Sequence, residues 1–252
     1  MKKNEVLFSV LLRSYFIQAL WNFERMQNIG FVFGLRPFLR YLYPDAQERK
    51  AAILRHTNFF NTHPYMVSLI FGMVASFEEE IKSGKATVPE QVNVLKNNMA
   101  GPLAAIGDSF FWATWRPFSV LVTACCALVF VKFKLDLNGL LVPAIFVFVY
   151  NVAPVPFRYW SLKVGYQLHN SIIELIASLE FQYLVDILKL VSIVMLAVVF
   201  VSYFFIYAQG LLYMGVFIGV FALSILLGCF RFSPTLLFFA VIALGVALAY
   251  IV

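Results

Sequence analysis

The sequence is poor in charge. Only 13% of its 252 residues are Asp, Glu, Lys or Arg, about half the share found in an ordinary soluble domain. From Leu190 to Val252 the sole charged residue is Arg231, which is too little polar cover for a soluble fold of this size. With 62% hydrophobic residues, the chain is predicted to be an integral membrane protein that lipid covers.

Histidine and cysteine are also scarce, which excludes several kinds of site. Three scattered histidines are too few for a zinc site, and the three cysteines lie inside apolar runs without metal-ligand spacing. No set of nucleophile, base and orienting residue is visible, nor is a glycine loop for phosphate. We therefore expect no metal, no cofactor and no catalytic residue. No cleavable signal peptide is expected, because Arg13 and Gln18 interrupt the first apolar run.

The charge that is present is mostly positive and unevenly placed. The net charge is +6, and basic residues cluster in the N-terminal part and between apolar runs. This distribution is typical of the positive-inside bias of membrane proteins and does not indicate nucleic-acid binding. A cytoplasmic N-terminus would leave Lys132 and Lys134 on the wrong side but place five others in cytoplasmic loops: Arg116, Arg158, Lys163, Lys189 and Arg231. We therefore predict a multi-pass protein with its N-terminus in the cytoplasm.

Residues 5–60 are predicted to form amphipathic helices that do not span the membrane. One helical face gathers Val6, Leu7, Val10, Leu11, Ser14 and Ile17. This face would lie either in the lipid interface or against other parts of the protein, and the pattern favours neither. Arg13 and Arg55 could meet anionic headgroups, and the three arginines Arg25, Arg36 and Arg40 could meet headgroups or a partner.

The predicted fold class is all-α, with these amphipathic helices, re-entrant or half-helices and about five transmembrane helices. The apolar run 64–77 would reach only about 21 Å as a helix, and we expect it to end in a hydrated Glu78–Glu80 run. A capping pattern from Thr87 to Glu90 starts the next helix, and Gly101–Pro102 is expected to stop it. The predicted spans are 112–131, 139–157, 190–207, 211–229 and 235–252. The chain divides into an interfacial part (1–63), a membrane core (64–168) and a C-terminal membrane region (169–252).

Two polar stretches are candidates for binding a substrate. Pro64 favours an extended conformation at His63, which puts Asn61, Thr62 and His63 on non-helical backbone suited to a neutral, hydroxyl-rich ligand. The alternative is that Asn61 or Thr62 caps a helix while His63 packs at an interface. Asp108 follows Gly107 at the start of an apolar segment, where it would either cap the next helix or act as a ligand.

These stretches resemble the IID component of the mannose-type phosphotransferase systems. The matching segments include WNFERMQ at 21–27, FFNTHPY at 59–65, GPLAAIGDSFFWATWRPF at 101–118, and RYW at 158–160. The resemblance covers about residues 8–168. Beyond Asn170 it fades, and an extramembrane insert usual before the last hydrophobic segments is shortened here.

The resemblance implies a sugar permease of the bacterial inner membrane. It implies a IIC membrane partner, a trimer of IIC–IID pairs, and phosphorylated IIA and IIB proteins that supply the phosphoryl group. The IID subunit itself would not be phosphorylated. In this interpretation Asn61, Thr62, His63 and Asp108 are candidate sugar ligands, and the three arginines are candidate contacts to IIB or to headgroups. A subunit that only stabilises IIC and docks IIB is the alternative.

Overall fold

The computed structural model describes residues 2–85, 88–134, 139–168 and 181–207, and single positions at 215, 219, 239 and 243. Within these residues the regular structure is helical, as predicted, and strands are absent apart from isolated bridges at Met26. The helices are α1 (Lys3–Ser14), α2 (Asn28–Leu42), α3 (Ala46–Arg55), α4 (Val67–Lys82), α5 (Pro89–Gly107), η1 (Asp108–Trp115, a π-helix), α6 (Arg116–Lys132), α7 (Leu141–Asn151), α8 (Pro154–Leu168) and α10 (Phe181–Tyr207).

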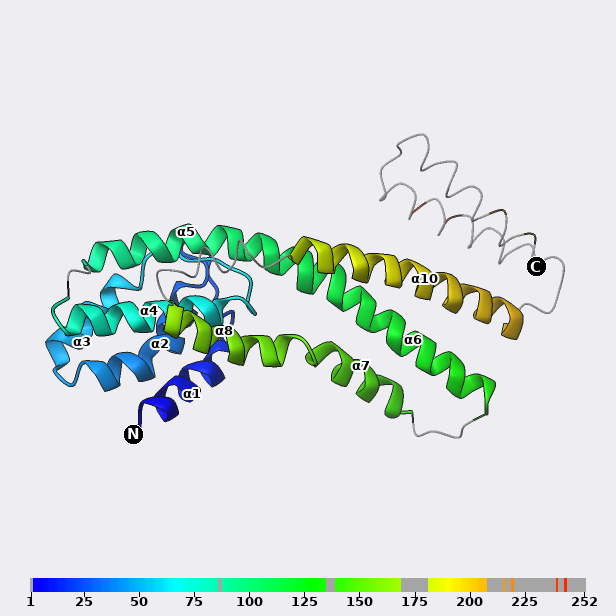
Figure 1. Cartoon of the computed structure of the whole chain (residues 1–252), viewed down its shortest axis with the longest axis horizontal. Helices are drawn as coiled ribbons and strands as arrows, with labels where there is room; N and C mark the ends of the chain where they lie inside the picture. The colour runs from blue at the N-terminus through cyan, green and yellow to red at the C-terminus, as the bar shows by residue number, and fades with distance from the viewer. Residues whose placement is uncertain are drawn as a thin grey trace.

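The described part is elongated, with a helical lobe at one end and an arm of long helices at the other (Figure 1). The lobe contains α1–α5 and α8, and the arm is formed by α6, α7 and α10. In the arm, α6 packs against both α7 and α10. We use "lobe" and "arm" for these two parts throughout.

The predicted apolar face of α1 is confirmed, and it packs on protein. Val6, Val10, Leu11 and Ser14 are buried in the lobe, as is Ile17 beyond the helix end. α1 contacts α2, α4 and α8. Of the two alternatives for this face, contact with lipid or with protein, the structure therefore shows contact with protein.

The apolar run 64–77 forms most of α4, the central helix of the lobe. It is a short helix, as predicted, but protein encloses it, because all residues from Val67 to Glu78 are buried. The prediction of a hydrated end at Glu78–Glu80 is wrong for Glu78, since the helix continues to Lys82 and leaves Glu78 0% exposed.

A close crossing of α4 and α8 organises the lobe. A Cβ atom on Gly72 would lie 2.2 Å from the carbonyl oxygen of Leu162, and one on Gly165 would lie 2.2 Å from that of Leu69. Backbone cannot move aside as a side-chain tip can, so glycine is required at both positions. These two glycines let the helices approach until their backbones touch.

The expected stop at Gly101–Pro102 is wrong, because α5, η1 and α6 form one continuous helix. Pro102 lies inside α5, and the helix from Pro89 to Lys132 has 44 residues, roughly 66 Å. Asp108 therefore lies within a helix at the change from α to π geometry and does not cap a new one. Because the hydrocarbon core is only about 30 Å thick, this helix serves both parts: α5 covers the lobe and α6 enters the arm (Figure 1).

Three helices among the described residues are long and apolar enough to span a membrane: Pro89–Lys132, Leu141–Leu168 and Phe181–Ser202. They contain the predicted span 112–131 and most of the predicted spans 139–157 and 190–207. The predicted spans 211–229 and 235–252 fall largely outside the described residues, as does residue 87 of the expected capping pattern.

Four of the basic residues from which the orientation was predicted lie within helices and not in loops: Arg116, Arg158, Lys163 and Lys189. They therefore do not supply the loop charge on which the prediction of a cytoplasmic N-terminus was based.

Candidate functional site

The two candidate binding stretches meet in the structure. A Cβ atom on Gly107 would lie 2.3 Å from Cγ of His63, so only glycine admits the ring at this point on α5. The His63 ring stacks on Phe111, with centroids 5.5 Å apart, and lies 4.6 Å from the Trp112 ring. This contact fixes the loop before α4 against the α5–η1 junction.

His63 is buried; its hydrogen bond defines its tautomer, and its burial defines its charge. Nδ1 accepts a hydrogen bond from the backbone N–H of Tyr65 at 3.2 Å, whereas Nε2 has no hydrogen-bond partner among the described residues. Burial lowers the pKa of His63 to about 4, and the charge of Arg158 acts in the same direction. The ring is therefore neutral at neutral pH.

Thr62 is held by hydrogen bonds on three sides. Its hydroxyl donates to the carbonyl of Ala100 at 2.9 Å. The amide of Gln27 pairs with its backbone: Nε2 donates to the Thr62 carbonyl at 2.8 Å, and Oε1 accepts from the Thr62 N–H at 3.1 Å. Thr62 thus fixes the loop that precedes α4 against Gln27 at the start of α2 and against Ala100 on α5.

Asn61 and Asp108 are exposed at this corner. Asn61 lies close to His63 in the sequence, and Asp108 directly follows Gly107, the residue that the His63 ring touches. An amide and a carboxylate together offer donors and acceptors to a neutral hydroxyl-rich ligand. Thr62 and His63 are thus buried at this contact, and Asn61 and Asp108 are the exposed polar residues next to it in the sequence.

Toward the other end of α4, the lobe contains a buried ionic cluster centred on Glu78, which was not predicted from the sequence. Glu78 Oε1 lies 2.9 Å from Nε2 of His56 and 3.1 Å from Nε of Arg55. The hydroxyl of Tyr43 donates to Oε2 at 2.8 Å. Arg55 at the end of α3, His56 just after it and Tyr43 just after α2 thus converge on one carboxylate of α4.

The pKa shifts in this cluster fit a charged carboxylate beside a neutral imidazole. Burial lowers the pKa of His56, and the bond to Glu78 only partly offsets this effect. Burial also acts to raise the pKa of Glu78, but the hydrogen bond to His56, the charge of Arg55 and the bond from Tyr43 outweigh it and lower that pKa. Arg55 then supplies the main positive charge for Glu78.

A buried lysine completes the core near this cluster. Lys96 on α5 is 0% exposed, and its Nζ lies 5.0 Å from the ring centroid of Phe31 and 5.6 Å from that of Phe60. Ring faces attract a desolvated cation. Nζ has no hydrogen-bond partner among the described residues, so the aromatic faces provide its nearest support.

A second buried cation links α1 to α8. Arg158 is 2% exposed, and its NH1 donates to the carbonyl of Ser14 at 3.2 Å and to its hydroxyl at 3.0 Å. The guanidinium also lies over the rings of Tyr15 and Tyr65, 4.4 and 4.9 Å from their centroids. Arg158 therefore anchors the end of α1 to α8.

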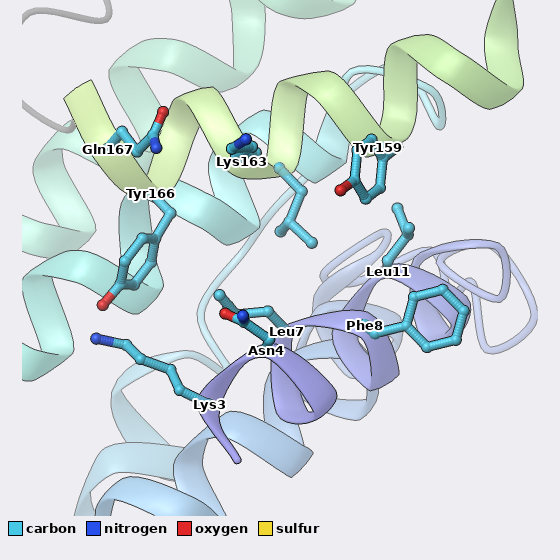
Figure 2. A pocket seen from close by; sticks show the side chains of 10 residues that line it. Lys3, Asn4, Leu7, Phe8, Leu11, Tyr159, Lys163, Tyr166 and Gln167 are labelled. Carbon is cyan, nitrogen blue, oxygen red and sulfur yellow. The ribbon is translucent and has the colours of Figure 1, made fainter.

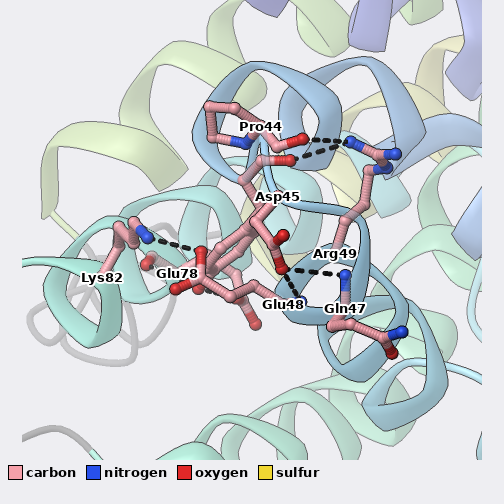
Figure 3. A network of polar contacts seen from close by, with 8 residues as sticks. Pro44, Asp45, Gln47, Glu48, Arg49, Glu78 and Lys82 are labelled. Carbon is pink, nitrogen blue, oxygen red and sulfur yellow. Dashed lines mark hydrogen bonds and ion pairs between the residues drawn. The ribbon is translucent and has the colours of Figure 1, made fainter.

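A polar network at the surface of the lobe adjoins the Glu78 cluster (Figure 3). Asp45 caps α3 by accepting from the N–H groups of Gln47 and Glu48, both at 2.9 Å. Arg49 donates to the carbonyl oxygens of Tyr43 and Pro44. Lys82 at the end of α4 pairs with Glu48. This network orders the α2–α3 turn that presents Tyr43 to Glu78.

The predicted arginines separate into two groups. Arg36 and Arg40 lie on one exposed face of α2 and, with Arg13 of α1, line a groove of about 560 Å³. Arg25 precedes α2 and pairs with its neighbour Glu24 at 3.1 Å. Arg13, which was also predicted to meet headgroups, lies beside Arg36 and Arg40 because α1 packs on α2.

A further pocket of about 380 Å³ lies between α1 and α8 (Figure 2). Leu7, Leu11 and Leu162 form its apolar part, and Lys3, Lys163 and Tyr166 form part of its polar side. Lys3 pairs with Glu79 at 2.9 Å, and the hydroxyl of Tyr166 also donates to Glu79. The pocket is thus amphiphilic, with one of its lysines already neutralised.

Comparison with known proteins places this fold. The family described as "PTS system mannose/fructose/sorbose family IID component" matches residues 2–251. The chain is 39% identical over 158 residues to the mannose-specific EIID component of Escherichia coli K12, covering 62% of this chain and 53% of that protein. It is 32% identical over 180 residues to the fructose permease IID component of Bacillus subtilis, covering 71% of this chain and 62% of that protein. The chain thus spans about half the length of the curated relatives it matches.

Two solved structures resemble the fold. One, described as the mannose transporter ManYZ in complex with microcin E492, has a TM-score of 0.61 and 32% identity, covering 79% of this chain and 70% of that chain. The other, described only as a membrane protein, has a TM-score of 0.72 and 25% identity, covering 98% of this chain and 97% of that chain. The family match over nearly the whole length agrees with the membrane-spanning helices and with the segments that carried the resemblance. The chain belongs to the IID component family of the mannose/fructose/sorbose phosphotransferase systems.

Proposed function

We propose that this chain is the IID membrane subunit of a phosphoenolpyruvate-dependent sugar permease. It translocates a hexose-type sugar together with a IIC subunit, while IIB, recharged by IIA, phosphorylates the sugar. The observation that carries the proposal is the family match over residues 2–251. The similarity to a mannose transporter structure supports a role in transport.

The distribution of reactive groups supports a subunit that binds and does not catalyse. The polar corner at Asn61 and Asp108 has no nucleophile–base pair among the residues with described contacts. His63, which stands closest to it, is buried and neutral. In the proposed role, Asn61 and Asp108 contact the sugar, while Thr62 and His63 hold the loop that carries Asn61. The lobe faces the cytoplasm with the N-terminus, in a bacterial inner membrane and in a trimer of IIC–IID pairs.

The alternative is a scaffold that stabilises IIC and docks IIB without touching the sugar. The long arm favours this alternative in one respect, because its helices leave apolar side chains such as Phe133, Leu140 and Phe148 exposed for a partner or for lipid. Equilibrium sugar binding by the purified IIC–IID pair separates the two roles. A transport subunit contributes to affinity, and a scaffold contributes only to the assembly of the pair.

We expect Asn61→Ala to weaken hexose binding by the purified pair about fivefold. One hydrogen bond to a ligand is worth about 1 kcal/mol, and the Asn61 side chain is exposed, so its truncation should not disturb folding. Isothermal titration with mannose, fructose and sorbose measures the change. The matched control is Asn97→Ala, which removes an exposed amide from α5. Unchanged affinity in the Asn61 variant, with the pair intact, would favour the scaffold.

A further inference from the structure

The groove between α1 and α2 concentrates positive charge without a neutralising carboxylate. Arg13, Arg36 and Arg40 line it, together with Ser9 and Tyr41. Among the described residues, none of the three arginines forms an ion pair with Asp or Glu, whereas Arg25, Arg55 and Lys82 each do. Guanidinium groups that converge on an open groove suit a phosphate, which each can bind through two parallel N–H groups.

Pro37 helps to build this groove. A proline inside a helix cannot donate to the carbonyl four residues earlier, and here that carbonyl belongs to Phe33. The guanidinium of Arg13 donates to this free carbonyl oxygen at 3.4 Å and lies 4.7 Å from the centroid of the Phe33 ring. Arg13 is thereby held at one end of the groove, while Arg36 and Arg40 stand one helical turn apart along its wall.

An exposed apolar ridge adjoins the groove. Phe8 and Leu12 lie on α1 opposite its buried face, and Phe16 continues the same spacing just beyond the helix end; their exposures are 55%, 51% and 57%. On the other flank of this ridge lies the pocket of Figure 2, with Lys163 and with Lys3, which pairs with Glu79. α1 thus presents apolar side chains between the arginine groove and a border that contains Lys163, which is the pattern of a helix that lies in a membrane interface.

The lobe is also within reach of headgroups. Arg158 ties Ser14, the last residue of α1, to α8, and α8 belongs to the continuous helix Leu141–Leu168 that can span the membrane. The ridge and the arginine groove therefore lie next to the point where the lobe meets the arm. A soluble acidic protein would account for the arginines but not for the apolar ridge beside them.

We propose that the groove lined by Arg13, Arg36 and Arg40 binds the phosphate headgroup of an anionic phospholipid, whose acyl chains lie along the Phe8–Leu12–Phe16 ridge. The ligand chemistry is a phosphodiester attached to an apolar chain. The site is separate from the Asn61–Asp108 corner, and it does not depend on which sugar the protein handles.

The test is native mass spectrometry of the full-length chain in detergent, titrated with dioleoyl-phosphatidylglycerol or with zwitterionic dioleoyl-phosphatidylcholine. The parent chain is expected to retain phosphatidylglycerol in preference. Arg36→Gln/Arg40→Gln should weaken this binding roughly 30-fold, since each basic residue near a lipid surface contributes about fivefold. The control Arg25→Gln/Lys50→Gln removes the same charge from exposed sites outside the groove and should change binding less than about twofold. Circular dichroism checks that each variant is folded, and Arg40→Gln alone replaces the double variant if that one is not, with about a fivefold loss.

Four results would overturn the proposal. Phosphatidylcholine could bind as tightly as phosphatidylglycerol, or the control could lose as much binding as the groove variant. Millimolar inorganic phosphate could displace the lipid, which would assign the groove to a free anion. Lipid binding could also stay unchanged in the groove variant while IIB no longer associates with the IIC–IID pair, which would assign the groove to an acidic protein surface.

Discussion

Gly72→Ala is expected to destabilise the protein by about 3 kcal/mol or more and to lower the unfolding temperature by about 10 °C. The added Cβ would lie 2.2 Å from the carbonyl oxygen of Leu162 and 2.6 Å from the backbone nitrogen of Tyr166. Neither atom can move without moving α8, so the two helices must separate. Thermal unfolding in detergent, followed by circular dichroism, measures the shift.

Gly101→Ala is the matched control for this substitution. It makes the same chemical change inside α5, but a Cβ there meets nothing within 4 Å. Alanine is favoured over glycine in a helix by up to about 1 kcal/mol, so this variant should be as stable as the parent or slightly more so. Equal losses in the two variants would contradict the close α4–α8 crossing.

Glu78→Gln is expected to cost about 3 kcal/mol of folding free energy. Removing one partner of a buried ionic cluster leaves the other charges desolvated without compensation. Here Arg55, whose side chain is 16% exposed, would lose its carboxylate while Lys96 stays buried nearby. The amide can still accept from Tyr43, so the loss reports mainly on charge. Chemical denaturation with tryptophan fluorescence measures it.

Glu48→Gln provides the comparison, because it breaks an ion pair at the surface. Glu48 and Lys82 are 48% and 38% exposed, and such pairs contribute about 1 kcal/mol or less. The structure therefore predicts a clearly larger loss at Glu78 than at Glu48. Similar losses at the two sites would mean that Glu78 is hydrated in the folded protein, as the triple-glutamate run suggested.

Glu78 shows why charge patterns alone misplace a residue. Three consecutive glutamates after an apolar run predict a hydrated helix end, and Glu79 and Glu80 are partly exposed. Glu78 continues the helical spacing of the buried Phe71 and Val74, which was the available signal. Its partners come from α2 and from the end of α3, more than twenty residues away. Burial of a charge depends on these tertiary partners, which periodicity does not reveal.

The helices themselves were largely predictable, and their breaks were not. Apolar spacing identified the buried face of α1 and the membrane-spanning character of α6, α7 and α10. Gly101–Pro102 predicted a stop, but α5 continues through both residues even though the proline removes one backbone hydrogen bond. Local preference was outweighed by the packing of α5 along the lobe.

The candidate site was partly predictable. Sequence reasoning selected the loop at Asn61–His63 and the Gly107–Asp108 pair separately, but not their contact, which depends on the fit of the His63 ring against Gly107. It also selected Arg13, Arg36 and Arg40 as headgroup contacts, but not the groove that they share, which forms only when α1 packs on α2. Their roles in binding sugar or headgroups are still predictions.

The central claim is that this chain is a required membrane subunit of a sugar permease. The most direct measurement is phosphoenolpyruvate-driven uptake of labelled mannose, fructose or sorbose into sealed vesicles that contain IIC, with IIA, IIB and the general phosphotransferase proteins supplied on the side where IIB acts. We expect phosphorylated sugar to accumulate inside the vesicles only when this chain is present with IIC. Uptake at the same rate in vesicles that lack the chain, with IIC at an equal level, would contradict the account.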